Sequence, residues 1–168
     1  MKPDHLAMFK IGVSIVLASL LELLVFAQSW LGHYGFWFRP EWVALVVIYW
    51  GLYMPHRCGV FFAWCVGLWL DVLHGTLLGQ QAAALAIQAY CTYVVYLRFR
   101  VFPVIYQSGV VMVLIGINLL VNRTLQGVVT GVTESWLYYL PILSSALLWP
   151  VVAWLLDSVR GIKHRVQI

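Results

Sequence analysis

Charged residues are scarce in this sequence. Its 168 residues include ten Lys or Arg and six Asp or Glu, so charged residues make up 10% of the chain and hydrophobic residues 63%. A soluble domain is about 25% charged, and so few charges cannot cover the surface of a 19.1 kDa globule. With a mean hydropathy of +0.90, the composition excludes a water-exposed catalytic domain and predicts a chain whose solvent is the lipid bilayer.

Several signals of metal, nucleotide or nucleic-acid chemistry are also missing. The cysteines Cys58, Cys65 and Cys91 form no CxxC pair, which favours thiols that act as small hydrophobic side chains. There is no glycine-rich phosphate loop, so this chain alone cannot couple ATP hydrolysis to transport. The net charge of +4 comes from basic residues between apolar runs, so we expect no nucleic-acid partner.

What the sequence does contain is a series of apolar runs, which predict six membrane spans in one polytopic domain, residues 1–168. The spans cover residues 11–30, 42–54, 59–73, 81–97, 104–121 and 138–156. The second and third are too short for a hydrocarbon core of roughly 30 Å, so they must lean on neighbours or recruit flanking residues. Pro150 should kink the last helix by freeing the carbonyl of Ala146. Residues 124–137 fit either a loop or an interfacial helix.

Basic residues are distributed unevenly between the two sides of this predicted bundle. With the N-terminus inside, every Lys and Arg lies on the inner side except Arg39 and Arg123. This bias predicts cytoplasmic N- and C-termini. The first run also has features of a signal peptide, but Glu22 within it favours a retained span.

An enzyme is not expected. An intramembrane aspartyl hydrolase needs two carboxyl groups within hydrogen-bond reach, whereas Asp71, Asp157 and Glu22 fall at three different depths. A serine or cysteine nucleophile needs a histidine at its own depth, and the five histidines lie at span ends or in the tails. We therefore predict no catalytic site, no metal and no cofactor.

Small residues recur at every fourth position of the third span. Gly59, Ala63 and Gly67 form one helical stripe, and Gly75 and Gly79 continue the spacing beyond it. Small side chains at this spacing let another backbone approach closely. The stripe is a candidate packing face, and its spacing fits a partner helix in this chain or in another protein.

Asp71 is a carboxylate at membrane depth, which is costly unless it is paired or hydrated. In one interpretation it lines an outward-facing polar pocket together with Arg39, Glu41 and Glu22. In the other it is a helix-end carboxylate satisfied by an arginine or by backbone amides.

Glu22 raises a similar question halfway along the first span. It is either a relay or ligand hook in a proton or solute pathway, or a protonated structural carboxyl. In the second case we expect it to bond a polar neighbour such as Gln88 or Asn118.

Residues 39–87 carry short motifs in a characteristic order. They are Arg39-Pro40, Tyr49-Trp50, PHRCG at 55–59, GLWLDV at 67–72 and GTLLGQ at 75–80. In these pieces, and in its length, span number and basic C-terminal tail, the sequence resembles the MreD family of rod shape-determining proteins.

The resemblance implies a small inner-membrane partner of MreC in the bacterial cell-elongation machinery, which carries out lateral peptidoglycan synthesis. MreB filaments, the glycosyltransferase RodA and an elongation-specific penicillin-binding transpeptidase belong to that assembly. The implied fold is an all-α membrane protein similar to the substrate-binding subunits of energy-coupling-factor transporters, which are six-helix bundles with an outward pocket. The family brings no established enzymatic activity.

Two functions are therefore open. In the first, the chain is a membrane scaffold that binds MreC, with Gly59, Ala63 and Gly67 as a candidate surface. In the second, it is a binding subunit of a transporter-like complex, whose outward pocket near Asp71 and Arg39 takes a small polar molecule or a lipid headgroup.

Overall fold

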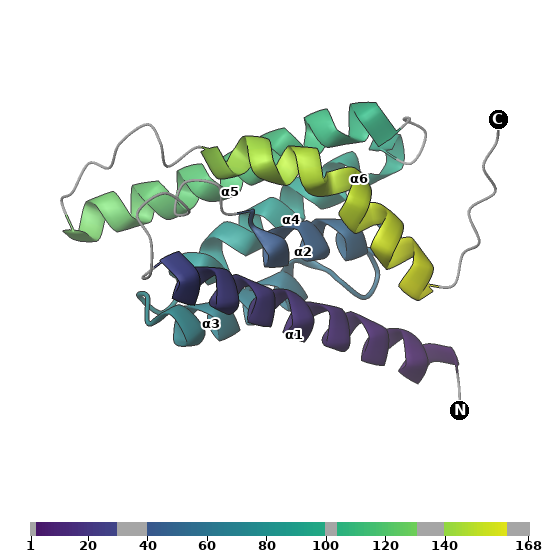
Figure 1. Ribbon diagram of the computed structural model, residues 1–168, viewed down its shortest axis with the longest axis horizontal. Helices are drawn as coiled ribbons and strands as arrows, with labels where there is room; N and C mark the ends of the chain where they lie inside the picture. Colours follow the sequence, from purple (N-terminus) through teal and green to yellow (C-terminus); the bar gives the residue numbers. More distant parts are fainter. Residues whose placement is uncertain (1–2, 30–39, 100–103, 131–139, 161–168) are drawn as a thin grey trace.

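The computed structural model describes residues 3–29, 40–99, 104–130 and 140–160 (Figure 1). In these ranges the chain forms α-helices and no strand, which confirms the all-α class. The helices are α1 (Pro3–Ser29), α2 (Trp42–Tyr53), α3 (Val60–His74), α4 (Gln80–Phe99), α5 (Val104–Thr130) and α6 (Leu140–Arg160).

Within the described residues, three segments are long and apolar enough to cross a membrane. They are His5–Leu24, Tyr106–Val128 and Leu140–Arg160. The helices α2 and α3 are apolar but shorter, with 12 and 15 residues, as the sequence predicts. α5 continues to Thr130, so residues 124–130 extend the fifth span, and residues 131–139 lie outside the described residues.

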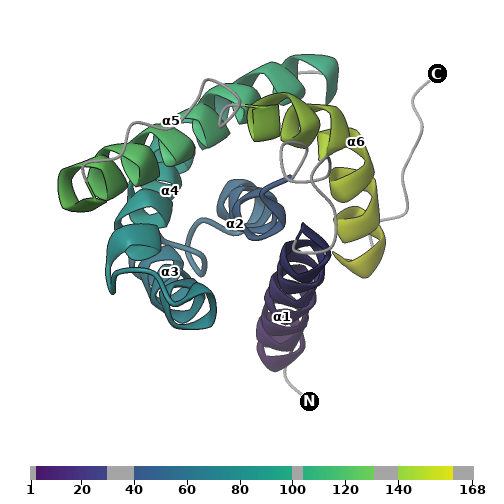
Figure 2. The same cartoon turned by 60° about the vertical axis from the view of Figure 1, so that its left-hand side comes forward.

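α2 lies at the centre of the bundle, with the other helices arranged around it (Figure 2). Every residue from 43 to 52 is buried, as expected of a helix that is apolar on all sides. Its contacts are with α1, α4, α5 and α6. Because a 12-residue helix is about 18 Å long, α2 cannot cross a bilayer alone. Its neighbours, rather than lipid, form its surroundings.

α1 packs on α2 through a single stripe. The buried positions Ile11, Ile15, Ala18 and Glu22 recur every three or four residues, which places them on one helical face. Near this stripe, the indole N–H of Trp50 donates a hydrogen bond to the Ser14 hydroxyl at 2.9 Å. The rest of α1 is largely apolar and exposed, as expected of a surface in contact with lipid.

α6 bends in its middle, at Pro150 (Figure 1). The bend follows from the proline, which has no N–H to donate to the preceding turn. Beyond it, the Tyr49 hydroxyl of α2 donates a short hydrogen bond to Asp157. Arg160 lies 3.9 Å from the same carboxylate, and its guanidinium carbon is 4.2 Å from the Tyr53 ring centroid. These contacts fix the end of α6 against the end of α2.

The described basic residues are segregated along the bundle. α1 begins and α6 ends at the same end of the molecule (Figure 1). At this basic end, Lys10 lies in the first third of α1, Arg57 precedes α3, and Arg98 and Arg160 lie at the ends of α4 and α6. Arg123 lies in the far half of α5. The separation matches the charge asymmetry along the sequence.

We expect Tyr49→Phe to destabilise the protein by about 1–2 kcal/mol, because it removes the hydrogen bond that joins α2 to the kinked half of α6. Tyr90→Phe is the matched control, since Tyr90 is 60% exposed. Thermal unfolding of the two variants in the same detergent tests this. Equal midpoints would show that the Tyr49 hydroxyl contributes nothing to stability.

Candidate functional site

The carboxylate of Asp71 joins the end of α3 to the start of α4. It accepts hydrogen bonds from the backbone N–H groups of Gly79 and Gln81, each at 2.8 Å, and from the Thr76 hydroxyl at 2.9 Å. A longer contact of 3.4 Å comes from the N–H of Ala82. Asp71 is only 1% exposed, so these donors replace water as its partners.

The chain between the two helices is shaped to bring these donors to Asp71. α3 ends at His74, and the φ of 63° at its C-cap Gly75 lies in the left-handed region that glycine adopts without strain. Gly79 has a φ of 101°, and α4 begins directly after it. The first N–H groups of a helix have no partner within the helix, and they favour a negative charge. Asp71 supplies both an acceptor and that charge from the preceding helix.

The small residues of α3 face α4. A Cβ atom at Gly67 would lie 2.3 Å from the Cα and 2.6 Å from the backbone nitrogen of Ala82, so the two backbones are in direct contact. Ala63, one turn earlier, is completely buried. Of the two partners that the spacing allowed, the structure places a helix of the same chain on this part of the stripe.

The other glycines of the predicted stripe have different surroundings. A Cβ at Gly75 or Gly79 would meet nothing within 4 Å, and one at Gly59 would have only the Pro55 carbonyl oxygen at 4.0 Å. Gly75 and Gly79 are required for their positive φ angles rather than for close packing. The close helix contact is therefore concentrated at Gly67.

A chain of buried amides connects α4, α5 and α2, and sequence reasoning missed it. Asn122 donates to Gln81 at 3.0 Å and to Asn118 at 2.9 Å. Asn118 in turn donates to Gln88, which donates to the Ala44 carbonyl at 3.4 Å. The signal was present, because positions 81 and 88 share one helical face, as do positions 118 and 122. Amides in an apolar interior are stable when they bond one another.

Glu22 and His74 come together from α1 and α3. Glu22 Oε1 lies 4.0 Å from His74 Nε2, and Glu22 is 7% exposed. Gln88 and Asn118, the neighbours expected for Glu22, bond each other. The carboxylate of Asp71 faces the start of α4.

Of the two remaining residues of the predicted pocket, Glu41 lies among the described residues. Glu41 precedes α2, where its side chain makes no capping hydrogen bond and its backbone N–H donates to the Ser145 hydroxyl at 3.1 Å. Arg39 lies outside the described residues.

The thiol of Cys58 is buried between α2 and α3. Cys58 is 4% exposed, and burial raises the pKa of its thiol to about 12, which keeps it protonated and weakly nucleophilic.

We expect Gly67→Ala to lower the thermal midpoint and the yield, because the added methyl would overlap the backbone of α4. A cost of about 1–3 kcal/mol is typical of such overpacking. Gly109→Ala is the control, since a Cβ there meets nothing within 4 Å and the change favours helix. If both variants unfold at the wild-type temperature, α3 and α4 are not in backbone contact.

Substitutions around Asp71 should form a graded series in thermal unfolding. Asp71→Ala leaves three backbone N–H groups and a hydroxyl without their acceptor, which we expect to cost about 3 kcal/mol or more. Thr76→Val removes one donor and keeps the carboxylate, so we expect a cost of about 1 kcal/mol. Asp71→Ala with near-wild-type stability would contradict this account of the carboxylate.

Comparison with known proteins gives the family. The family model described as rod shape-determining protein MreD matches residues 5–159. The rod shape-determining protein MreD of Haemophilus influenzae is 28% identical over 130 residues, which cover 77% of this chain and 78% of that protein. No solved structure matches the chain. Because the family model spans most of the sequence, the chain belongs to the MreD family of rod shape-determining proteins.

Proposed function

We propose that this chain is a multi-pass scaffold subunit of the bacterial inner membrane, with both termini in the cytoplasm, that binds MreC. In this role it supports lateral peptidoglycan synthesis by the cell-elongation machinery and is not an enzyme. We propose that it associates with RodA, the elongation-specific transpeptidase and MreB indirectly, as members of the same complex. The observation that carries the proposal is the match to the rod shape-determining family over residues 5–159.

The polar side chains inside the bundle bond one another, and this supports a scaffold. Asp71 and the amides of Gln81, Gln88, Asn118 and Asn122 form contacts between helices of the same chain. What these helices present outward is mainly apolar side chains. Such a surface suits association with lipid and with a partner's transmembrane helix, where packing rather than polar chemistry gives affinity.

The orientation is supported by the segregation of charge. Lys10, Arg57, Arg98 and Arg160 gather at the end of the bundle where α1 begins and α6 ends. Positive residues favour the cytoplasmic side of a membrane, so we assign the basic end to the cytoplasm.

The alternative of an outward ligand pocket draws no support from Asp71. Both of its carboxylate oxygens accept hydrogen bonds from the turn and from the start of α4. A ligand there would have to displace these donors and leave the helix uncapped.

Affinity purification of the full chain from its host in a mild detergent tests the scaffold. We expect MreC to copurify at a constant ratio that survives washing. If the chain is recovered alone, or together with an ATPase module, the scaffold proposal is wrong.

The partner surface can be located with bulky substitutions on outward faces. Val72, Val94, Val113 and Leu147 lie on α3, α4, α5 and α6, and all are more than half exposed. Replacing each by Trp should reduce MreC recovery on one face and leave the other three as controls. A partner helix contacts only part of the circumference, so equal losses from all four variants would indicate indirect association.

A further inference from the structure

An apolar groove lies between α1 and the second half of α6. Its volume is about 210 Å³, and its lining on α1 extends from Phe9 to Leu21. Val152 and Val159 contribute to the opposite wall, and Trp42 and Val46 of α2 form the floor. The positions from Phe9 to Leu21 span about 18 Å along the helix, so the groove is elongated along α1.

The fold explains why the groove is open. α1 contacts α2 through one buried stripe, and this leaves the side of α1 that faces α6 uncovered. The bend at Pro150 then brings the second half of α6 alongside α1, with little direct contact between the two (Figure 2). A space remains that lipid or another apolar group must fill.

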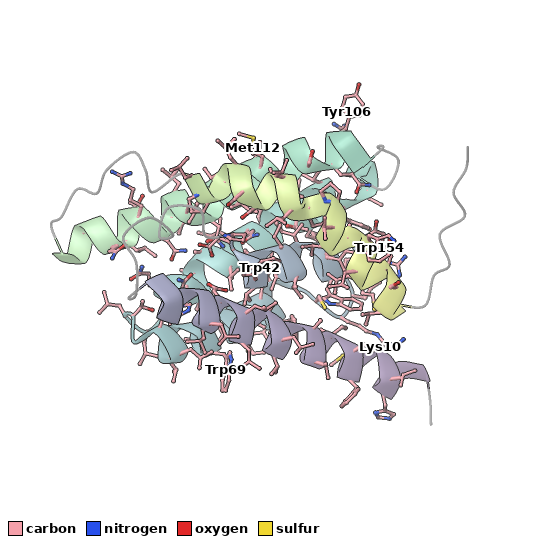
Figure 3. All side chains as sticks on the ribbon, viewed as in Figure 1. Lys10, Trp42, Trp69, Tyr106, Met112 and Trp154 are labelled. Atoms are coloured by element: carbon pink, nitrogen blue, oxygen red, sulfur yellow. The ribbon has the colours of Figure 1, made fainter. Side chains whose placement is uncertain are left out.

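A positive charge marks one end of this groove. Lys10 lines it at the basic end of the bundle, and Trp42 lies farther along (Figure 3). Within the described part of the chain, Lys10 forms no ion pair, whereas the neighbouring Arg160 is engaged by Asp157 and Tyr53. The Ser14 hydroxyl already bonds Trp50 and the Ile11 carbonyl. Among the residues that line the groove, Lys10 is thus the cation that can bind a ligand.

The chemistry of the lining favours a lipid as the occupant. The walls of the groove are almost wholly apolar, and Lys10 is the one charged residue among them. An acyl chain fits such walls, and an anionic headgroup fits the cation at the end of the groove. Basic pockets between transmembrane helices are known to hold anionic headgroups.

We propose that this groove binds one anionic phospholipid, with an acyl chain between α1 and α6 and the phosphate at Lys10. The site lies at the opposite end of the bundle from Asp71. The lipid would complete the contact between α1 and α6 that protein side chains leave open.

Native mass spectrometry of the purified chain tests the headgroup contact. The chain is equilibrated with equal amounts of phosphatidylglycerol and phosphatidylcholine that carry identical acyl chains. We expect one retained phosphatidylglycerol in preference to phosphatidylcholine, and about a fivefold smaller preference in Lys10→Gln, as loss of one charge near a headgroup implies. Arg98→Gln, at the same end of the bundle, should keep the wild-type preference. Equal losses in the two variants would show a general charge effect and overturn the proposal.

The acyl-chain contact needs a second pair of variants. Val13 lines the groove and is 40% exposed, whereas Leu20 is 50% exposed elsewhere on α1. We expect Val13→Trp to reduce lipid retention at least threefold and Leu20→Trp to leave it unchanged, with equal helix content by circular dichroism. If Val13→Trp instead lowers MreC recovery and leaves lipid retention intact, a partner helix occupies the groove and the lipid proposal is wrong.

Discussion

The contact between α3 and α4 is the constraint on which the rest of the bundle depends. Gly67 permits the two backbones to touch, and Asp71, one turn later, caps the helix that touches it. Neither feature is sufficient alone. Without glycine the start of α4 could not reach Asp71, and without the carboxylate the buried N–H groups of α4 would lack an acceptor, at a cost of about 1–3 kcal/mol each.

The position of α4 in turn determines which polar groups meet inside the bundle. Once its first turn is fixed, Gln81 and Gln88 face α5 and meet Asn122 and Asn118. Gln88 also reaches the backbone of α2 at Ala44. The central helix is apolar on every side and carries little information about its own rotation. The hydrogen bond from the Gln88 side chain of α4 supplies some of that information. Buried polar groups act in this way when they specify one arrangement among many apolar ones.

The sequence was sufficient to predict where the helices lie, but not which polar side chains of different helices bond each other. Hydropathy and prolines located the six described helices, because a bilayer imposes an apolar run on each span. α1 begins eight residues before its predicted start, and α5 ends nine residues after its predicted end. At Gly67, one position of the predicted stripe, the backbones of α3 and α4 meet. The pairing of Gln88 with Asn118 was not foreseen, because it depends on which faces of distant helices meet, and apolar runs do not encode this. The positive φ angles of Gly75 and Gly79 were likewise hidden, since the same spacing fits both a packing stripe and a turn.

The use of polar groups within the chain bears on function. A binding protein presents polar side chains to its ligand, but here Asp71 and the amide chain from Gln81 to Gln88 are engaged between helices. Specificity for a partner or a lipid must then come from the shape of the outer surface and from charges at its ends. The groove beside α1, with Lys10 at one end, is such a feature for a lipid. In a protein of this size, the internal polar groups fix the bundle, and the surface that this bundle presents determines what it can bind.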